Sequence, residues 1–188
     1  MIDYVTLMLL NLATGLVLLA YFVFSGVEKA DRRKWIPGFG AVGAIALTTG
    51  LHMTLTWPLS GSYNIAFGEM SVLYGLLFLM ASICIAQNWN LLTVALYGFF
   101  AGLAAIIIGV RLYALNLTLL PWVSALGFIL SGLGGVCAVP ALYIHNKAFR
   151  LLGVAVLLGA AAIWFATGYG AYWQHLSDFS DWQPAPMR

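Results

Sequence analysis

Long apolar runs, separated by short polar connections, dominate the sequence. Each run has the length of about 20 residues that an α-helix needs to cross the hydrocarbon core of a membrane. The alternating pattern of a β-strand is absent, and backbone groups in lipid must be bonded within the protein, so helices are expected. The pattern predicts an all-α integral membrane bundle, a single domain over residues 1–188, with six transmembrane helices. They cover residues 4–26, 36–57, 65–85, 91–112, 122–144 and 149–172.

The composition agrees with a membrane environment. Of the 188 residues, 63% are hydrophobic and 7% are charged. An average soluble domain carries about 25% charged residues, so this chain has too few charges to cover its surface in water. The lipid bilayer is therefore the expected partner, and no nucleic-acid partner is expected.

Basic residues gather in two of the predicted connections. They are Lys29, Arg32, Arg33, Lys34, Lys147 and Arg150. With six spans, both connections lie on one side of the membrane, and basic connections stay in the cytoplasm. We therefore expect both termini to be extracytoplasmic, with Arg111 and Arg188 on their side. The expected location is the cytoplasmic (inner) membrane of a prokaryote.

An imidazole and a carboxylate lie on either side of the turn that joins the second and third predicted spans. His52 is about 7 Å inside the outer boundary, at 1.5 Å per helical residue, and Glu69 is about one turn below the surface. Thr48, His52 and Thr56 share one helix face. Ionisable groups inside a membrane are costly and usually face the bundle interior or a wet cavity. The sequence therefore predicts that His52 and Glu69 meet at a polar site.

Four further polar residues reach comparable levels and complete this expected binding site. They are Asn11, Tyr63, Asn64 and Arg111. In the alternative interpretation, Glu69 and Arg111 lie at the interface, where they snorkel or pair, and His52 bonds a helix carbonyl. For Arg111, which stands close to the predicted boundary, we favour this alternative.

A metal or haem site is the second possibility for the same end of the bundle. Its candidate ligands are His52, Glu69, His175 and Asp178, and His145 stands at the opposite end. Closely spaced His or Cys pairs, typical of structural metal sites, are missing. We therefore predict no cofactor, with haem or copper as the alternative. Cys84 and Cys137 are expected to be small buried apolar residues.

Glycine-rich segments within the spans favour close helix packing over nucleotide binding. The segment "GFGAVG" (38–43) has dinucleotide-binding spacing, but it follows no strand. Small residues let membrane helices approach closely, and Gly132, Gly134, Gly135, Gly153 and Gly159 fit the same role. "TGYG" (167–170) lacks the preceding pore helix of a potassium filter.

Two family resemblances rest on quoted segments. "LTWPLSGSYNIAFGE" (55–69) with "LYGLLFL" (73–79) resembles a family of small polytopic prokaryotic membrane proteins of unknown function. "GEMSVLYG" (68–75) and "NWNLLTVALYGFFAGLAAI" (88–106) resemble the urea/amide channel family in architecture. That family also has a carboxylate in its last helix, which is absent from residues 151–173 here. The resemblance therefore implies a role for Glu69 alone.

These observations lead to a channel or carrier for a small neutral or weakly polar solute, with a polar vestibule in the outer leaflet. Aromatic constrictions pass such solutes and exclude hydrated ions. The candidate aromatic residues are Tyr97, Phe99, Phe100, Trp164 and Phe165. The alternatives are a subunit of a redox or metal-dependent membrane complex, with haem, copper or quinone, and a structural or assembly subunit. We expect no enzyme activity from the chain alone, and we expect a homo-oligomer or a larger membrane complex.

Overall fold

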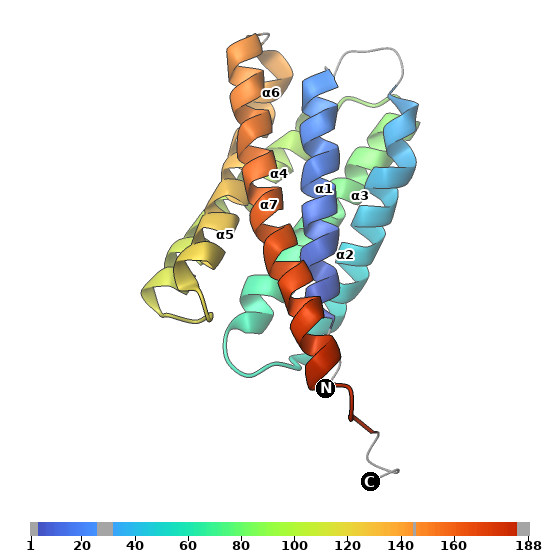
Figure 1. The fold of residues 1–188 in the computed structure, drawn as a ribbon. Helices are drawn as coiled ribbons and strands as arrows, with labels where there is room; N and C mark the ends of the chain where they lie inside the picture. The colour runs from blue at the N-terminus through green and yellow to red at the C-terminus, as the bar shows by residue number, and fades with distance from the viewer. Residues whose placement is uncertain (1–3, 26–31, 145, 184–188) are drawn as a thin grey trace.

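The computed structural model describes residues 4–25, 32–144 and 146–183, and Figure 1 shows their helices running side by side. The elements in chain order are α1 (Val5–Ser25), the 3-10 helix η1 (Arg33–Trp35), α2 (Ile36–Thr56), the π-helix η2 (Asn64–Glu69), α3 (Met70–Ala86), α4 (Leu92–Ala114), α5 (Pro121–Val136), α6 (Ala138–Tyr143) and α7 (Lys147–Asp178). No strand occurs among these residues, which confirms the all-α prediction for this part of the chain. The start of α1 and the end of α7 lie at the same end of the bundle (Figure 1).

Five helical stretches in the described residues are long and apolar enough to cross a membrane. They are Val5–Ser25, Arg33–Thr56, Asn64–Ala86, Leu92–Ala114 and Lys147–Asp178. The first four match predicted spans within a few residues. The last continues past the predicted end at residue 172. The structure is therefore that of a helical membrane protein.

The remaining predicted span, residues 122–144, is not one helix. Its residues form α5, of 16 residues, and α6, of six, with Cys137 between them. Pro140 explains the interruption, because it has no N–H for the carbonyl of Val136 and its ring clashes with that carbonyl in a regular helix. At 1.5 Å per residue, α5 is about 24 Å long, shorter than the hydrocarbon core of about 30 Å. In Figure 1, α5 lies along the lower half of the bundle and α6 lies at the opposite end.

Glycines hold α2 against α3. A methyl group on Gly43 would lie 2.5 Å from the backbone nitrogen of Leu79, and one on Gly75 would lie 2.5 Å from the backbone nitrogen of Leu47. A β-carbon on Gly135 would meet the Gly98 carbonyl in the same way, in the contact between α4 and α5. These contacts confirm the packing prediction for Gly43 and Gly135, and small-residue packing of this kind drives membrane helices together.

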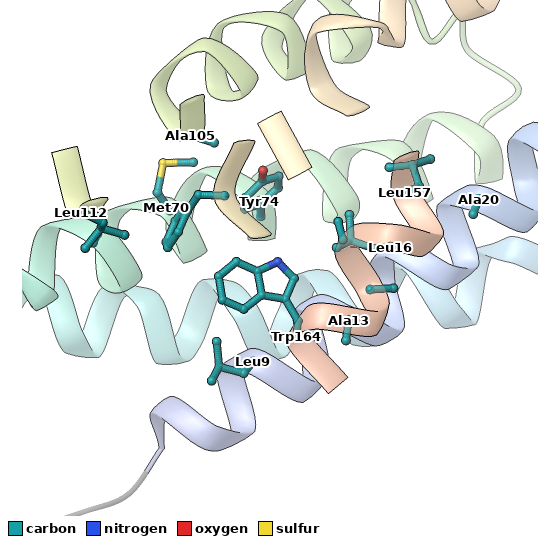
Figure 2. Packing of buried hydrophobic residues seen from close by; sticks show 14 residues of the cluster. Leu9, Ala13, Leu16, Ala20, Met70, Tyr74, Ala105, Leu112, Leu157 and Trp164 are labelled. Carbon is teal, nitrogen blue, oxygen red and sulfur yellow. The ribbon is translucent and has the colours of Figure 1, made fainter. Parts of the chain in front are cut away.

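The interior is centred on Trp164 of α7, whose side chain is 1% exposed. Side chains from α1, α3, α4, α5 and α7 surround it, and Figure 2 shows its indole nitrogen on the side that faces Tyr74. A second cluster joins Phe22, Trp35, Phe39 and Phe78 through edge-on ring contacts. The two clusters fix the relative positions of α1, α2, α3 and α7.

The α2–α3 contact gives a stability prediction. Gly75→Ala forces two backbones apart, and we expect it to lower the free energy of unfolding by about 1–3 kcal/mol, the range for overpacking. Gly170→Ala on α7 is the control, because a β-carbon there meets open space. Thermal unfolding in detergent, followed by tryptophan fluorescence, measures both. An equal midpoint for the two variants would contradict the proposed tight contact.

Candidate functional site

The structure places His52 and Glu69 on the protein surface. Both side chains are exposed, and neither lines either of the two cavities described below. The His52 ring makes an edge-on contact with Tyr4, at 5.4 Å between ring centroids. Thr48, His52 and Thr56 are all exposed, in agreement with their spacing. Glu69 ends the π-helix η2 and has no hydrogen-bond or ion-pair partner among the described residues.

The other residues of the predicted polar site serve separate contacts. Asn11 is buried and donates a hydrogen bond to the carbonyl of Val42 at 2.9 Å, which ties α1 to α2. Asn64 is buried and bonds both the N–H and the carbonyl of Leu59, so it holds the turn before η2. The Tyr63 hydroxyl donates to the Leu117 carbonyl, and Arg111 is exposed.

The candidate metal ligands also have separate surroundings. His175 Nδ1 lies 3.3 Å from the hydroxyl of Thr6, and Asp178 accepts a hydrogen bond from Gln174 at 2.9 Å. Within the described ranges, no three His, Cys, Asp or Glu side chains come together as a metal-binding group. His145, Lys29 and Arg188 lie outside those ranges. Both cysteines are free, Cys84 buried and Cys137 half-buried.

The described part of the structure contains a cavity of about 420 Å³, which we call the main cavity. Side chains from all seven α-helices of the described part, α1 to α7, line it. The lining is apolar apart from Tyr74, Ser131, Cys137 and Arg150. Its volume falls in the range of about 300–1,000 Å³ that is typical of small-molecule sites. An apolar lining with a few polar groups is also typical of such sites.

The interruption between α5 and α6 forms one wall of the main cavity. Gly135, Cys137, Ala138 and Ala141 line it on both sides of the break. Irregular backbone at membrane depth is tolerated only where it is buried in protein or lines a cavity. Gly153 of α7 also lines the cavity, and a β-carbon placed there would meet no atom within 4 Å. Gly153 was expected in a packing seam, but it leaves space instead.

Tyr74 and Ser131 end the main cavity near the middle of the bundle. The Ser131 hydroxyl donates to the Gly127 carbonyl at 2.7 Å and accepts from the indole N–H of Trp164 at 3.0 Å. Tyr74 and Ser131 also line a second hollow of about 30 Å³, the minor cavity, together with Trp164. Two cavities therefore meet at one small polar cluster.

Arg150 marks the other end of the main cavity. It lies in the first turns of α7, fourteen positions before Trp164, a separation of about 21 Å along a helix. Arg150 is half-buried and has no carboxylate partner among the described residues. Lys147, Arg33 and Lys34 are exposed, and α7 begins at the end of the bundle opposite the start of α1 (Figure 1).

Sequence reasoning missed the main cavity. Of the aromatic residues expected at a constriction, Trp164 is buried in the interior, Phe99 and Phe165 are half-buried, and Tyr97 and Phe100 are exposed. Pro140 was the signal that could have located the cavity, because a proline deep in an apolar span indicates a broken helix. The small residues around it were assigned to helix packing. The sequence alone does not show whether a small residue packs against a neighbouring helix or lines a cavity.

The fold and its hollow define a class, a helical membrane bundle with a partly open cavity of ligand size between its helices. The chain belongs to the family described as "Protein of unknown function (DUF981)", whose model matches residues 1–178. This match confirms the resemblance to a family of unknown function, and the resemblance to the urea/amide channel family is not supported. Neither the curated proteins nor the solved structures include a match to the chain.

The Trp164–Ser131 hydrogen bond gives a second prediction. Ser131→Ala leaves the buried indole N–H without an acceptor, and an unsatisfied buried donor costs about 1–3 kcal/mol. We expect a lower free energy of unfolding by that amount, measured by thermal unfolding in detergent. Ser124→Ala, a half-buried serine on the same helix, is the control. A midpoint for Ser131→Ala that equals the control would show that the indole does not depend on this hydroxyl.

Proposed function

We propose that the protein is a membrane carrier that binds a small, largely apolar molecule with a neutral, weakly polar group in the main cavity. The single observation that supports this function is a volume of about 420 Å³ with apolar walls inside the bundle. An apolar cavity of about 150 Å³ binds benzene, so the main cavity has room on that scale for roughly 17 carbon atoms. A monomeric bundle gains no stability from such a hollow, because unfilled volume forfeits packing contacts.

The position of the minor cavity supports transport rather than storage. It continues from Tyr74 and Ser131 towards the first turns of α1, with Met8 and Leu9 in its walls. Trp164 closes this route through its bond to Ser131. We propose that the described conformation is open at the α6 end and closed at the other, and that movement of Trp164 joins the two cavities.

The proposed site differs from the one that the sequence favoured. His52 and Glu69 are exposed and line neither cavity, so in this proposal they do not contact the ligand. No specific contact among the described residues supports the alternatives of a redox complex or a structural subunit. The main cavity carries the assignment instead.

We also propose that α5 and α6 share one membrane crossing, which gives six crossings with both termini extracytoplasmic. The exposed basic residues Arg33, Lys34 and Lys147 support this orientation, because basic connections stay in the cytoplasm. The cytoplasmic membrane of a prokaryote is the proposed location. The α6 end of the main cavity then faces the cytoplasm.

Filling the main cavity tests the proposed site. Gly153→Leu adds a side chain where no atom lies within 4 Å, and leucine has a better helix propensity than glycine, so folding should be preserved. The probe is a neutral long-chain alcohol that carries a diazirine, and adducts are mapped by mass spectrometry. We expect labelling of main-cavity residues in the wild type. In Gly153→Leu this labelling should fall at least about fivefold, because a probe that binds beside the added leucine would pay an overpacking cost of about 1 kcal/mol.

Gly170→Leu is the matched control, because Gly170 lies on the same helix and also faces open space, but lines neither cavity. Its labelling should equal that of the wild type. Glu69→Gln and His52→Ala should also leave the labelling unchanged. Labelling confined to the lipid-facing surface, or equal in Gly153→Leu and Gly170→Leu, would refute the proposed site.

Orientation has its own test. In a background with Cys84→Ala and Cys137→Ala, single cysteines are placed at the exposed residues Ser60 and Lys147. Intact cells are treated with a maleimide that cannot cross membranes. We expect Ser60→Cys to react at once and Lys147→Cys to react only after permeabilisation, because the α6 end faces the cytoplasm. The opposite order would reverse the orientation.

A further inference from the structure

The main cavity reaches the surface of the bundle at a rim of leucines. Two of the described residues that line it are exposed, Leu133 of α5 at 37% and Leu152 of α7 at 63%. A residue that both lines a cavity and is exposed stands at its mouth, and we call the opening marked by these two leucines the portal. Because its rim is apolar, the portal suits a hydrocarbon chain from the bilayer better than a molecule from water.

A positive charge lies beside the portal. Arg150 is the only charged residue among the described residues that line the main cavity, and it precedes Leu152 by two positions. It is half-buried and has no carboxylate partner in the described part of the chain. Lys147 is exposed, also lacks such a partner there, and shares a helix face with Arg150 at a spacing of three residues. A partly buried charge without a partner is unfavourable, so an anion at this position would stabilise it.

The start of α7 contributes charge of the same sign. The helix begins at Lys147, and the side chain of Asn146 accepts the N–H groups of Ala148 and Phe149. A helix N-terminus carries a partial positive charge, so basic side chains there are unfavourable and an anion is favourable. Both basic side chains and the helix end therefore favour a negative group beside the portal.

The described residues supply no negative group at this end. Their carboxylates belong to Glu69, Asp178 and Asp181. Asp178 ends α7 about 42 Å along the helix from Arg150, and Asp181 follows it. Glu69 ends η2, which follows α2 at the end of the bundle where α1 begins (Figure 1). For the described part, the anion must come from a bound molecule.

An anionic phospholipid has both groups that this end of the cavity favours, a negative headgroup and a hydrocarbon chain. An arginine guanidinium binds phosphate oxygens through two parallel N–H groups, and Lys147 adds a second charge. A free phosphate would leave the apolar volume empty, and a neutral lipophile would leave Arg150 unpaired. Basic pockets between membrane helices on the cytoplasmic side bind anionic lipid headgroups in other proteins.

We propose that an anionic phospholipid of the adjacent leaflet binds here, with its phosphate on Arg150 and one acyl chain passing the portal into the main cavity. The cavity has room for roughly 17 carbon atoms on the scale used above, about one acyl chain. This inference goes beyond the proposed function and does not rest on it. Because the chain and the carried molecule use the same volume, the lipid competes with that molecule for the cavity.

A matched pair of lipids tests the inference in the full-length protein, held in bilayer discs of phosphatidylcholine. The probes are a phosphatidylglycerol and a phosphatidylcholine with the same diazirine-bearing acyl chain, and adducts are mapped by mass spectrometry. In the wild type we expect phosphatidylglycerol to label main-cavity residues about 5–25-fold more strongly, the factor for one or two basic residues. Arg150→Gln should lower this ratio about fivefold, because one of the two charges is gone.

Two arginine variants separate the headgroup contact from general effects. Arg150→Lys keeps the charge and should keep most of the ratio, so a loss in Arg150→Gln alone reports the charge rather than the fold. Arg111→Gln removes an exposed arginine that lines neither cavity, and its ratio should equal that of the wild type.

The position of the acyl chain has a separate control. Gly153→Leu fills the volume of the chain and leaves both basic residues in place. It should lower labelling of the main cavity by both lipids at least about fivefold, without a change in their ratio. Gly170→Leu should change neither.

Each result supports or overturns the inference. Equal ratios in Arg150→Gln and Arg111→Gln, or lipid adducts found only on the outer surfaces of the helices, would overturn it. If the neutral alcohol probe still labels the main cavity in that case, the proposed function stands. If neither the lipids nor the alcohol labels the main cavity, both are overturned.

Discussion

The missing N–H of Pro140 is the constraint on which the interior of this protein depends. Inside a membrane every backbone group needs a partner within the protein, and a proline in an apolar helix removes one. The fifth apolar segment therefore ends as α5 at Val136 and resumes as α6, with Cys137 between them. Because broken backbone is tolerated where it faces a cavity, the break and the main cavity lie together. Tyr74 and Ser131, which accepts a hydrogen bond from Trp164, then lie where that cavity meets the minor cavity.

Small residues have two opposite effects in the same bundle. At Gly43 and Gly75 they bring α2 and α3 into backbone contact, which leaves no room for a methyl group. At Gly153 the missing side chain leaves open space beside the broken helix. Tight contacts hold the helices together while open space remains beside some of the same helices, and a binding site needs both properties. A bundle with seams on every side would be more stable and could not bind a ligand.

The sequence predicted the membrane class and most helix positions, because apolar runs of about 20 residues leave few alternatives. It predicted a continuous fifth span, because hydropathy measures only apolar character and is insensitive to the missing N–H of Pro140. The candidate site was harder to predict. His52 and Glu69 were predicted to form a site because ionisable residues are rare in the spans. Rarity does not determine the direction of a side chain, and both residues are exposed. Tyr74 resembles any other interior aromatic residue until its neighbours in three dimensions are known.

The most direct test of this account is the position of a heavy atom in crystals of the full-length protein. The crystals are soaked with a neutral long-chain alcohol that carries bromine at the far end of its hydrocarbon, and bromine is located by anomalous scattering. The account predicts one bromine peak inside the main cavity, with density for the alcohol along its apolar walls. Bromine peaks found only on the outer, lipid-facing surfaces of the helices would contradict it.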